Sequence, residues 1–116
     1  MEIILAENHG FCYGVKRAVE MANEAAEGKG KSYTLGPIIH NPQVVGRLES
    51  KGVSPIQEVA DIDEGTMIIR SHGVGPAIYA EAEEKGLHIL DATCPHVKKA
   101  QQDAKSVIED GMTLVI

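Results

Sequence analysis

The chain has 116 residues, which is enough for one folded domain or for part of a larger protein. Its composition, 43% apolar and 24% charged, is that of a soluble globular domain, and a net charge of −6 without any Lys/Arg cluster argues against a nucleic-acid surface. The first ten residues lack the features of a signal peptide, and no apolar run reaches membrane-spanning length. We therefore expect a cytoplasmic protein with no nucleic-acid or membrane partner.

The first half of the chain alternates predicted strands and helices. An apolar run predicts a strand at residues 3–6, and apolar residues at helical spacing predict a helix over 15–26 that a glycine ends. The run 33–35 predicts a second strand. A second helix is expected to begin at Pro42, because proline has no N–H to lose in a first helical turn, and to end at Gly52.

The second half repeats this alternation. A strand at residues 66–70 precedes a helix that ends at Gly86, and a strand at 88–91 precedes a helix opened by Pro95. Residues 113–116 predict a last strand. Strands and helices that alternate at this short spacing predict an α/β fold with three layers, in which crossover helices cover a mostly parallel sheet.

Chemically active side chains follow four of the predicted strands. In a parallel sheet all the strand-to-helix loops lie along one edge, which is where ligands bind in such folds. The four loops carry Cys12, His40, His72 and Cys94. We therefore expect two thiols and two imidazoles to meet at this edge, although they are far apart in sequence.

The two cysteines are also placed where helices are expected to begin. Free N–H groups and the helix dipole favour the thiolate there, and the thiolate is the form that binds metal. Sulfur ligands beside helix N-termini suit an iron–sulfur centre next to a phosphorylated ligand, although two cysteines are too few for a cubane cluster. Three alternatives stay open: plain burial of each cysteine, a zinc site made with two histidines, and a phosphate-binding module without redox chemistry.

Four segments, in this order and with these separations, resemble one enzyme family. They are GFCYGVKRAVEMA, IIHNPQVVGRLESKG, RSHGV and LDATCPHVKK. They resemble the amino-terminal part of the 4-hydroxy-3-methylbut-2-enyl diphosphate reductases of the methylerythritol phosphate route to isoprenoids. The resemblance covers essentially the whole chain but only about the first third of a family member.

The resemblance implies an enzyme of three α/β units in a trefoil-like arrangement around a central cavity. Residues 1–112 would be the cluster-binding unit and residues 113–116 the first strand of the following unit. The segment Ile3–Ala6 is expected to be loosely held, because the family's first strand associates with another unit. A 4Fe–4S cluster would be bound by three cysteines, of which Cys12 and Cys94 are the first two, with the third ligand outside this segment.

The resemblance also implies the reaction. His40 and His72 match histidines that contact the substrate's diphosphate. The cluster iron without a protein ligand would take the substrate's hydroxyl, and electrons from ferredoxin or flavodoxin would break the C–O bond to give isopentenyl and dimethylallyl diphosphate. The proton-donating glutamate is expected beyond Ile116, so no catalytic residue is assigned in this segment. We expect residues 1–116 alone to be inactive.

Overall fold

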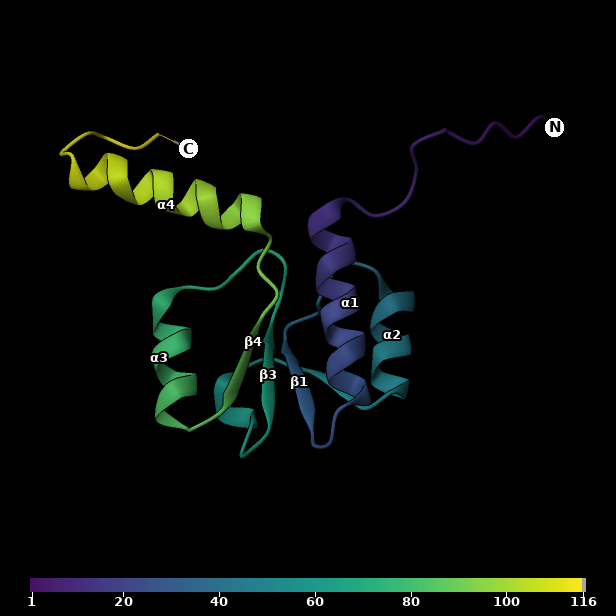
Figure 1. Ribbon diagram of the computed structural model, residues 1–116, viewed down its shortest axis with the longest axis horizontal. Coiled ribbons are helices and arrows are strands. Elements are labelled where there is room, and N and C mark those ends of the chain that lie inside the picture. Colours follow the sequence, from purple (N-terminus) through teal and green to yellow (C-terminus); the bar gives the residue numbers. More distant parts are fainter. Residues whose placement is uncertain (116) are drawn as a thin grey trace.

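A computed structural model describes residues 1–115. In chain order its elements are α1 (Tyr13–Glu27), β1 (Ser32–Leu35), α2 (Pro42–Ser50), β2 (Val53–Ile56), the 3₁₀ helix η1 (Val59–Asp61), β3 (Thr66–Ile69), α3 (Pro76–Glu84), β4 (His88–Asp91) and α4 (Pro95–Glu109). The strands form one parallel sheet in the order β2-β1-β3-β4 (Figure 1). The predicted parallel α/β sheet is confirmed.

Helices cover both faces of this sheet, which makes three layers (Figure 1). α1 and α2 pack on one face around a core that includes Ala18, Ala22, Ile38, Leu48, Val53 and Ile68. α3 and η1 pack on the other face around Leu35, Val59, Ile62, Met67, Ile69 and Ala82. Successive side chains of β3 reach opposite layers because side chains alternate along a strand.

Proline marks the start of three helices. Pro42, Pro76 and Pro95 each lie in the first turn of a helix, as the sequence predicted for the first and the last of them. At α2 the side chain of Asn41 also accepts hydrogen bonds from the backbone N–H groups of Gln43 and Val44, both at 3.1 Å. These bonds satisfy two of the donors that a helix N-terminus leaves free.

Strand β2 was not predicted from the sequence. It contains Pro55, and a proline normally counts against a strand because it cannot donate to the hydrogen-bonded ladder. The structure explains why this proline is tolerated. β2 lies at the edge of the sheet and pairs only with β1, so one of its sides needs no donors.

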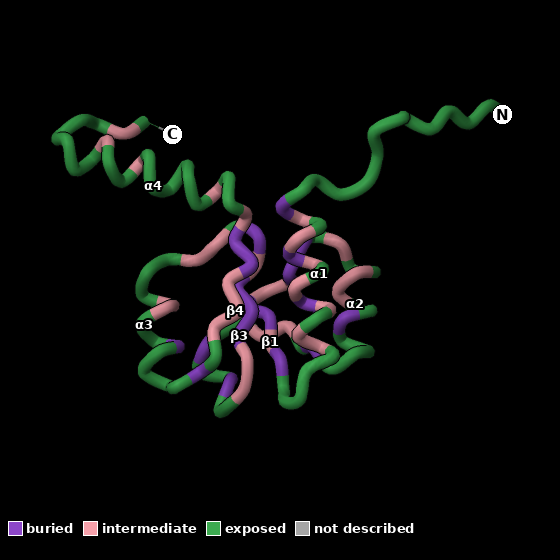
Figure 2. Tube along the Cα trace, viewed as in Figure 1, coloured by how far each residue is buried: buried purple, intermediate pink, exposed green. Residues whose placement is uncertain are grey.

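The predicted strands at the two ends of the chain are absent. Residues 3–6 and 113–115 pair with no other strand, and Ile116 lies outside the described residues. Ile3, Ile4 and Leu5 are exposed, and the segment that carries them leads away from the sheet (Figures 1 and 2). The apolar pattern of these segments fits a strand, but an isolated segment has no neighbouring strand to hydrogen-bond with.

Helix α4 does not cover the sheet as the predicted crossover helix would. It forms as expected, but none of its residues is buried, and the helix extends away from the body of the molecule (Figures 1 and 2). Its apolar stripe is therefore left open, with Val97, Ala104 and Val107 only half-buried and Ile108 exposed. Periodicity predicted the helix correctly but could not identify the surface that covers it.

Candidate functional site

Two of the four candidate residues lie at the point where the strand order of the sheet reverses. The chain leaves β1 toward β2 on one side and leaves β3 toward β4 on the other, so the loops after β1 and β3 flank a topological switch point. His40 is in the first of these loops and His72 in the second. Their rings stack, with centroids 5.4 Å apart and planes 28° from parallel.

A cavity of about 250 Å³ opens beside this histidine pair. Its lining consists of Phe11, Val15, Ile39, His40, Asn41, Ser71 and His72. Phe11 precedes Cys12, and Val15 lies in the first turn of α1, so the start of α1 forms one wall. The cavity therefore joins the histidine pair to the first cysteine segment.

The two cysteines begin helices α1 and α4. Cys12 and Cys94 are the N-cap residues, and neither side chain accepts a capping hydrogen bond. Both thiols are free; Cys12 is exposed and Cys94 is half-buried. Both sulfur atoms thus lie at the start of a helix without a capping hydrogen bond.

Gly14 brings the two helix starts into direct contact. It is buried in the first turn of α1, and a Cβ placed on it would lie 2.5 Å from Sγ of Cys94. The rings of Tyr13 and His96 also meet edge to face, with centroids 6.3 Å apart. Nη1 of Arg17 donates a hydrogen bond to the carbonyl oxygen of Thr93 at 3.3 Å.

The backbone of Cys94 links this contact to the histidine loop. Its N–H donates to the carbonyl oxygen of Ser71 at 2.9 Å, and Ser71 precedes His72. A continuous series of contacts therefore runs from the start of α1 through Cys94 to the stacked histidines. All four residues singled out from the sequence lie along one edge of the sheet.

Asp91 forms a polar network that sequence reasoning missed. Its carboxylate lies 2.6 Å from Nζ of Lys98, accepts from the Tyr79 hydroxyl at 3.0 Å and accepts from the backbone N–H of Thr93 at 2.9 Å. Burial alone would raise the pKa of Asp91, but the hydrogen bonds from Lys98, Thr93 and Tyr79 outweigh it and lower the pKa to about 2. Burial is the main cause of a raised Tyr79 pKa, to which Asp91 adds.

This network holds the end of β4 to the start of α4. Tyr79 comes from α3, Asp91 ends β4, and Lys98 lies in the first turn of α4. These hydrogen bonds and the ion pair surround the turn that carries Cys94. The available signal in the sequence was an acidic residue at a strand end, three positions before a cysteine.

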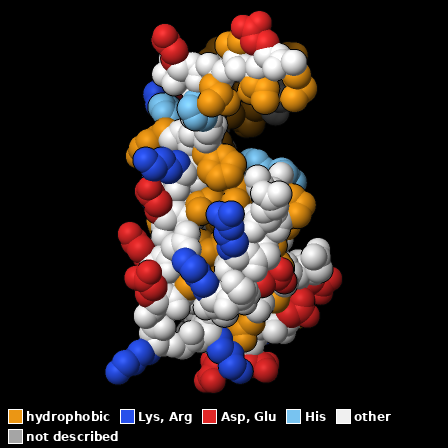
Figure 3. All heavy atoms as spheres, turned by 90° about the vertical axis from the view of Figure 1, so that its right-hand side faces the viewer, with side chains coloured by type: hydrophobic (Ala, Val, Ile, Leu, Met, Phe, Trp, Pro, Cys, Tyr) orange, Lys and Arg blue, Asp and Glu red, His pale blue; other side chains and the backbone are white. Residues whose placement is uncertain are grey.

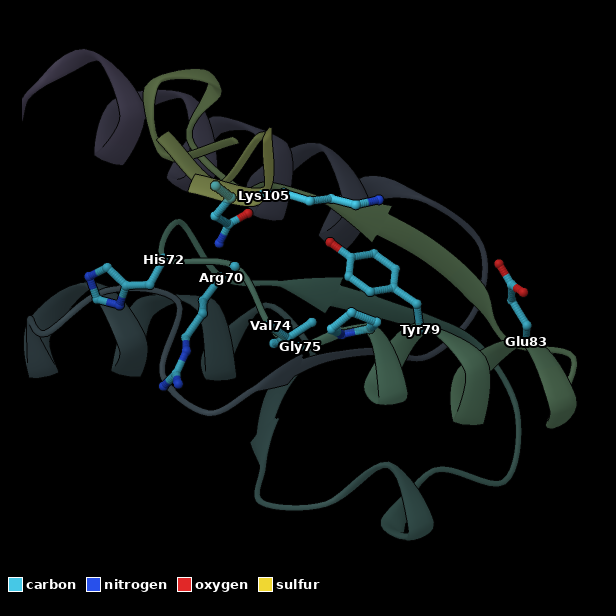
Figure 4. Close-up of a pocket in the computed structure, with 10 residues that line it drawn as sticks. Arg70, His72, Val74, Gly75, Tyr79, Glu83 and Lys105 are labelled. Carbon is cyan, nitrogen blue, oxygen red and sulfur yellow. The ribbon is translucent and has the colours of Figure 1, made fainter. Parts of the chain in front are cut away.

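A second cavity, of about 990 Å³, lies between the loop after β3, α3 and α4. Figure 4 shows Arg70, His72, Tyr79 and Lys105 around it. Nε of Arg70 is buried without a hydrogen-bond partner among the described residues. His72 lines both cavities and so stands at their junction.

The four candidate side chains, two thiols and two imidazoles, fit a shared metal centre only in part. Within residues 1–115, no group of three or more His, Cys, Asp or Glu side chains is arranged to hold a metal ion. The zinc alternative, with Cys12, Cys94 and two histidines as ligands, is therefore not formed by the described part of the chain. Two free thiols at adjoining helix starts do suit two ligands of an iron–sulfur cluster that takes a further ligand from elsewhere.

None of the helices in the described residues has the length and apolar composition to cross a membrane.

The space-filling view shows histidine side chains on the body just below the hydrophobic side chains that gather at its upper end (Figure 3). The exposed hydrophobic residues at the start of the chain are Met1, Ile3, Ile4, Leu5, Phe11 and Tyr13.

The fold and the site define an α/β protein with a cavity at its switch point and a pair of thiols on the same edge. Residues 3–116 match the family model described as LytB protein, and the chain belongs to this family.

Two reductases are more than half identical to this chain over its 116 residues. It is 54% identical to the 4-hydroxy-3-methylbut-2-enyl diphosphate reductase of Geotalea uraniireducens and 56% identical to that of Pelobacter propionicus. Each match covers 100% of this chain and 41% of the relative. The chain thus spans about two fifths of the length of these relatives.

Solved structures share its fold. A structure of (E)-4-hydroxy-3-methyl-but-2-enyl diphosphate reductase, the terminal enzyme of the non-mevalonate pathway, is 50% identical and superposes with a TM-score of 0.82 over 94% of this chain and 39% of that one. The E-1-hydroxy-2-methyl-but-2-enyl-4-diphosphate reductase from Plasmodium falciparum is 34% identical, with a TM-score of 0.85 over 90% of this chain and 33% of that one.

Proposed function

We propose that this chain is the amino-terminal part of an iron–sulfur reductase that removes the hydroxyl group of 4-hydroxy-3-methylbut-2-enyl diphosphate. The products would be isopentenyl and dimethylallyl diphosphate, with two electrons and two protons entering and water leaving. The observation that supports this most directly is the contact of Gly14 with Cys94, because it joins the two cysteine-bearing helix starts beside the histidine pair. Membership of the LytB family points to the same reaction.

Cys12 and Cys94 would hold two irons of a 4Fe–4S cluster, and a third cysteine would come from the remaining polypeptide. Such a cluster supplies electrons and a Lewis-acidic iron when it is bound. The part of this chain is to present two thiolates in fixed positions. Each cysteine is the N-cap residue of its helix, α1 or α4, so a rigid element fixes the position of its side chain.

His40 and His72 would bind the diphosphate. Both imidazoles are exposed at the cavity, and each can donate an N–H to a phosphate oxygen. Their stacked arrangement directs two donors to one small region, which suits an anion with several oxygens. This binding role orients the substrate, whereas the proton donor would be a glutamate of the remaining polypeptide.

We further propose that ferredoxin or flavodoxin supplies the electrons and that the reaction takes place in the cytoplasm. Residues 1–116 alone would not turn over substrate, because they lack the third cluster ligand and the proton donor. The family resemblance implied that the following unit begins at residue 113. Because α4 buries no side chain, we propose instead that this unit begins with α4 at Pro95.

The test uses the longer polypeptide that contains this chain, purified and reconstituted without oxygen. We expect Cys12→Ser and Cys94→Ser each to lose most of the bound iron and sulfide, since serine retains the shape of cysteine but is a poor cluster ligand. His40→Ala and His72→Ala should keep the iron and raise KM for the substrate at least tenfold. His88→Ala is the matched control, because His88 is exposed at the opposite end of the strands.

Two results would contradict the proposal. Full iron content in both cysteine variants would remove Cys12 and Cys94 from the ligand set. An unchanged KM in both histidine variants would remove the diphosphate role of the stacked pair.

A further inference from the structure

We propose that Gly14 is a positioning residue that sets where the Cys94 thiolate lies relative to Cys12. This inference rests on the proposed function, because it concerns the spacing of two ligands of one cluster. It assigns a role to the absence of a side chain at position 14, within the first turn of α1.

The contact at Gly14 leaves no room for even one methyl group. A Cβ there would lie 2.5 Å from Sγ and 2.8 Å from Cβ of Cys94, and 3.8 Å from its Cα. Ordinary contact between such atoms begins at about 3.5 Å. Sγ can move only by rotation of the Cys94 side chain, whereas Cβ is fixed to the backbone and stays in the way.

Backbone conformation does not account for a glycine at this position. Gly14 has ordinary right-handed helical geometry and is absent from the glycines of this chain with positive φ. Alanine would be the better residue for the helix itself, since glycine is a poor helix former. The close approach of Cys94 is therefore the feature that requires a glycine here.

Hydrogen bonds to neighbouring residues restrict how far Cys94 can move away from Gly14. Its N–H is bonded to the carbonyl oxygen of Ser71, and the carbonyl oxygen of Thr93 accepts from Arg17 of α1. An added methyl group must then either rotate the Cys94 side chain or separate the starts of α1 and α4. Both changes move Sγ of Cys94 relative to Cys12.

Gly46 provides a matched control in the same fold. It lies within α2, it also lacks a positive φ, and a Cβ placed on it would meet nothing within 4 Å. Gly46→Ala therefore adds the same methyl group to a helix without any new contact. Any effect peculiar to Gly14→Ala then comes from Cys94.

The experiment compares Gly14→Ala, Gly46→Ala and the unmodified longer polypeptide after anaerobic reconstitution. We expect Gly14→Ala to lose its iron to a chelator at least ten times faster than the unmodified protein and to show a shifted electron paramagnetic resonance spectrum of the reduced cluster. Gly46→Ala should match the unmodified protein in both measurements. Unchanged loss rate and spectrum in Gly14→Ala would overturn the inference.

A second measurement tests the contact in the metal-free protein. Gly14→Ala should lower the melting temperature when Cys94 is present, and this loss should disappear in a Cys94→Gly background, where the obstructing atoms are gone. A variant that fails to fold with Cys94 but folds in the Cys94→Gly background supports the inference equally. An equal loss in both backgrounds would contradict it.

The same series separates this inference from the proposed function. If Cys12→Ser and Cys94→Ser keep their iron, the ligand assignment fails. If those variants lose iron while Gly14→Ala holds its cluster normally, the ligand assignment stands and only the positioning role of Gly14 fails.

Discussion

At the scale of single residues, the edge of the sheet that carries the four candidate residues is stabilised by side chains to which we assign no chemical role. Asp91 binds Lys98, Tyr79 and the backbone of Thr93, and so fixes the turn that precedes Cys94. Arg17 ties the same turn to α1. Two residues proposed as ligands are thus positioned by contacts between segments that are distant in the chain.

Asp91 should make the stability of the fold depend on pH in the acid range. Its pKa in the folded chain is about 2, below its ordinary value of 3.8, so the folded state binds the proton less readily than the unfolded state. The stabilisation is complete above pH 5 and is lost as the pH falls from about 4 to 2. Because Lys98 is half-exposed, we expect about 1–2 kcal/mol in total.

Urea unfolding of metal-free protein between pH 2 and pH 7 measures this effect. The difference in unfolding free energy between the unmodified protein and Asp91→Asn should be largest near neutral pH and shrink toward pH 2. Asp103→Asn is the control, since its ion pair with Lys99 lies on the exposed surface of α4. Parallel pH profiles for the unmodified protein and Asp91→Asn would refute the assignment.

The sequence located His40, His72 and Cys94 because each follows a strand of the parallel sheet, and such loops lie at one edge. Cys12 follows no strand in the structure, and it reaches the same edge because α1 begins against Cys94. The roles of Gly14 and Asp91 depend instead on atomic contacts between α1, α3, β4 and α4. No spacing rule in the sequence encodes which of these surfaces touch.

At the scale of elements, local signals determined where helices begin. The cap at Asn41 satisfies two backbone donors of α2 and also holds the loop that carries His40. We expect Asn41→Ala to lower the free energy of unfolding by about 1 kcal/mol, because the cap is lost. Asn41→Ser keeps a side-chain acceptor and should lose much less.

Chemical denaturation of the three proteins tests this expectation. Equal losses in the alanine and serine variants would show that the Asn41 side chain stabilises the protein through contacts other than the cap.

Strands were predicted less well than helices, and each failure has a physical cause. The proline in β2 argued against a strand there, but a strand at the edge of the sheet can contain a proline. The apolar patterns at 3–6 and 113–116 predicted strands, but residues 3–6 and 113–115 pair with no strand of the described chain. A helix satisfies its own backbone hydrogen bonds, whereas a strand depends on a neighbour that local sequence does not reveal.

At the scale of the whole molecule, the segment before α1 and helix α4 both extend away from the sheet (Figure 1). The apolar stripe of α4 includes Val97, Val107 and the exposed Ile108. The chain spans 41% of its longer relatives, so we propose that the additional polypeptide covers this stripe.

Hydrogen exchange tests that proposal. Backbone amides of residues 100–109 should exchange at least 100 times more slowly in the longer polypeptide than in residues 1–116 alone, because packing suppresses local opening. Amides of β3, which is already buried in the sheet, serve as the internal control. Equal exchange of α4 in the two proteins would mean that another surface, or none, covers it.

The contact between Gly14 and Cys94 has a consequence for the biogenesis of the protein. All the strands of the described sheet lie between Cys12 and Cys94 in the chain, so the two helix starts meet only when the sheet forms. If both thiols bind a cluster as proposed, its insertion would therefore follow folding of the body. Before that stage the two thiols would be separate and open to oxidants, and neither alone would hold a cluster firmly.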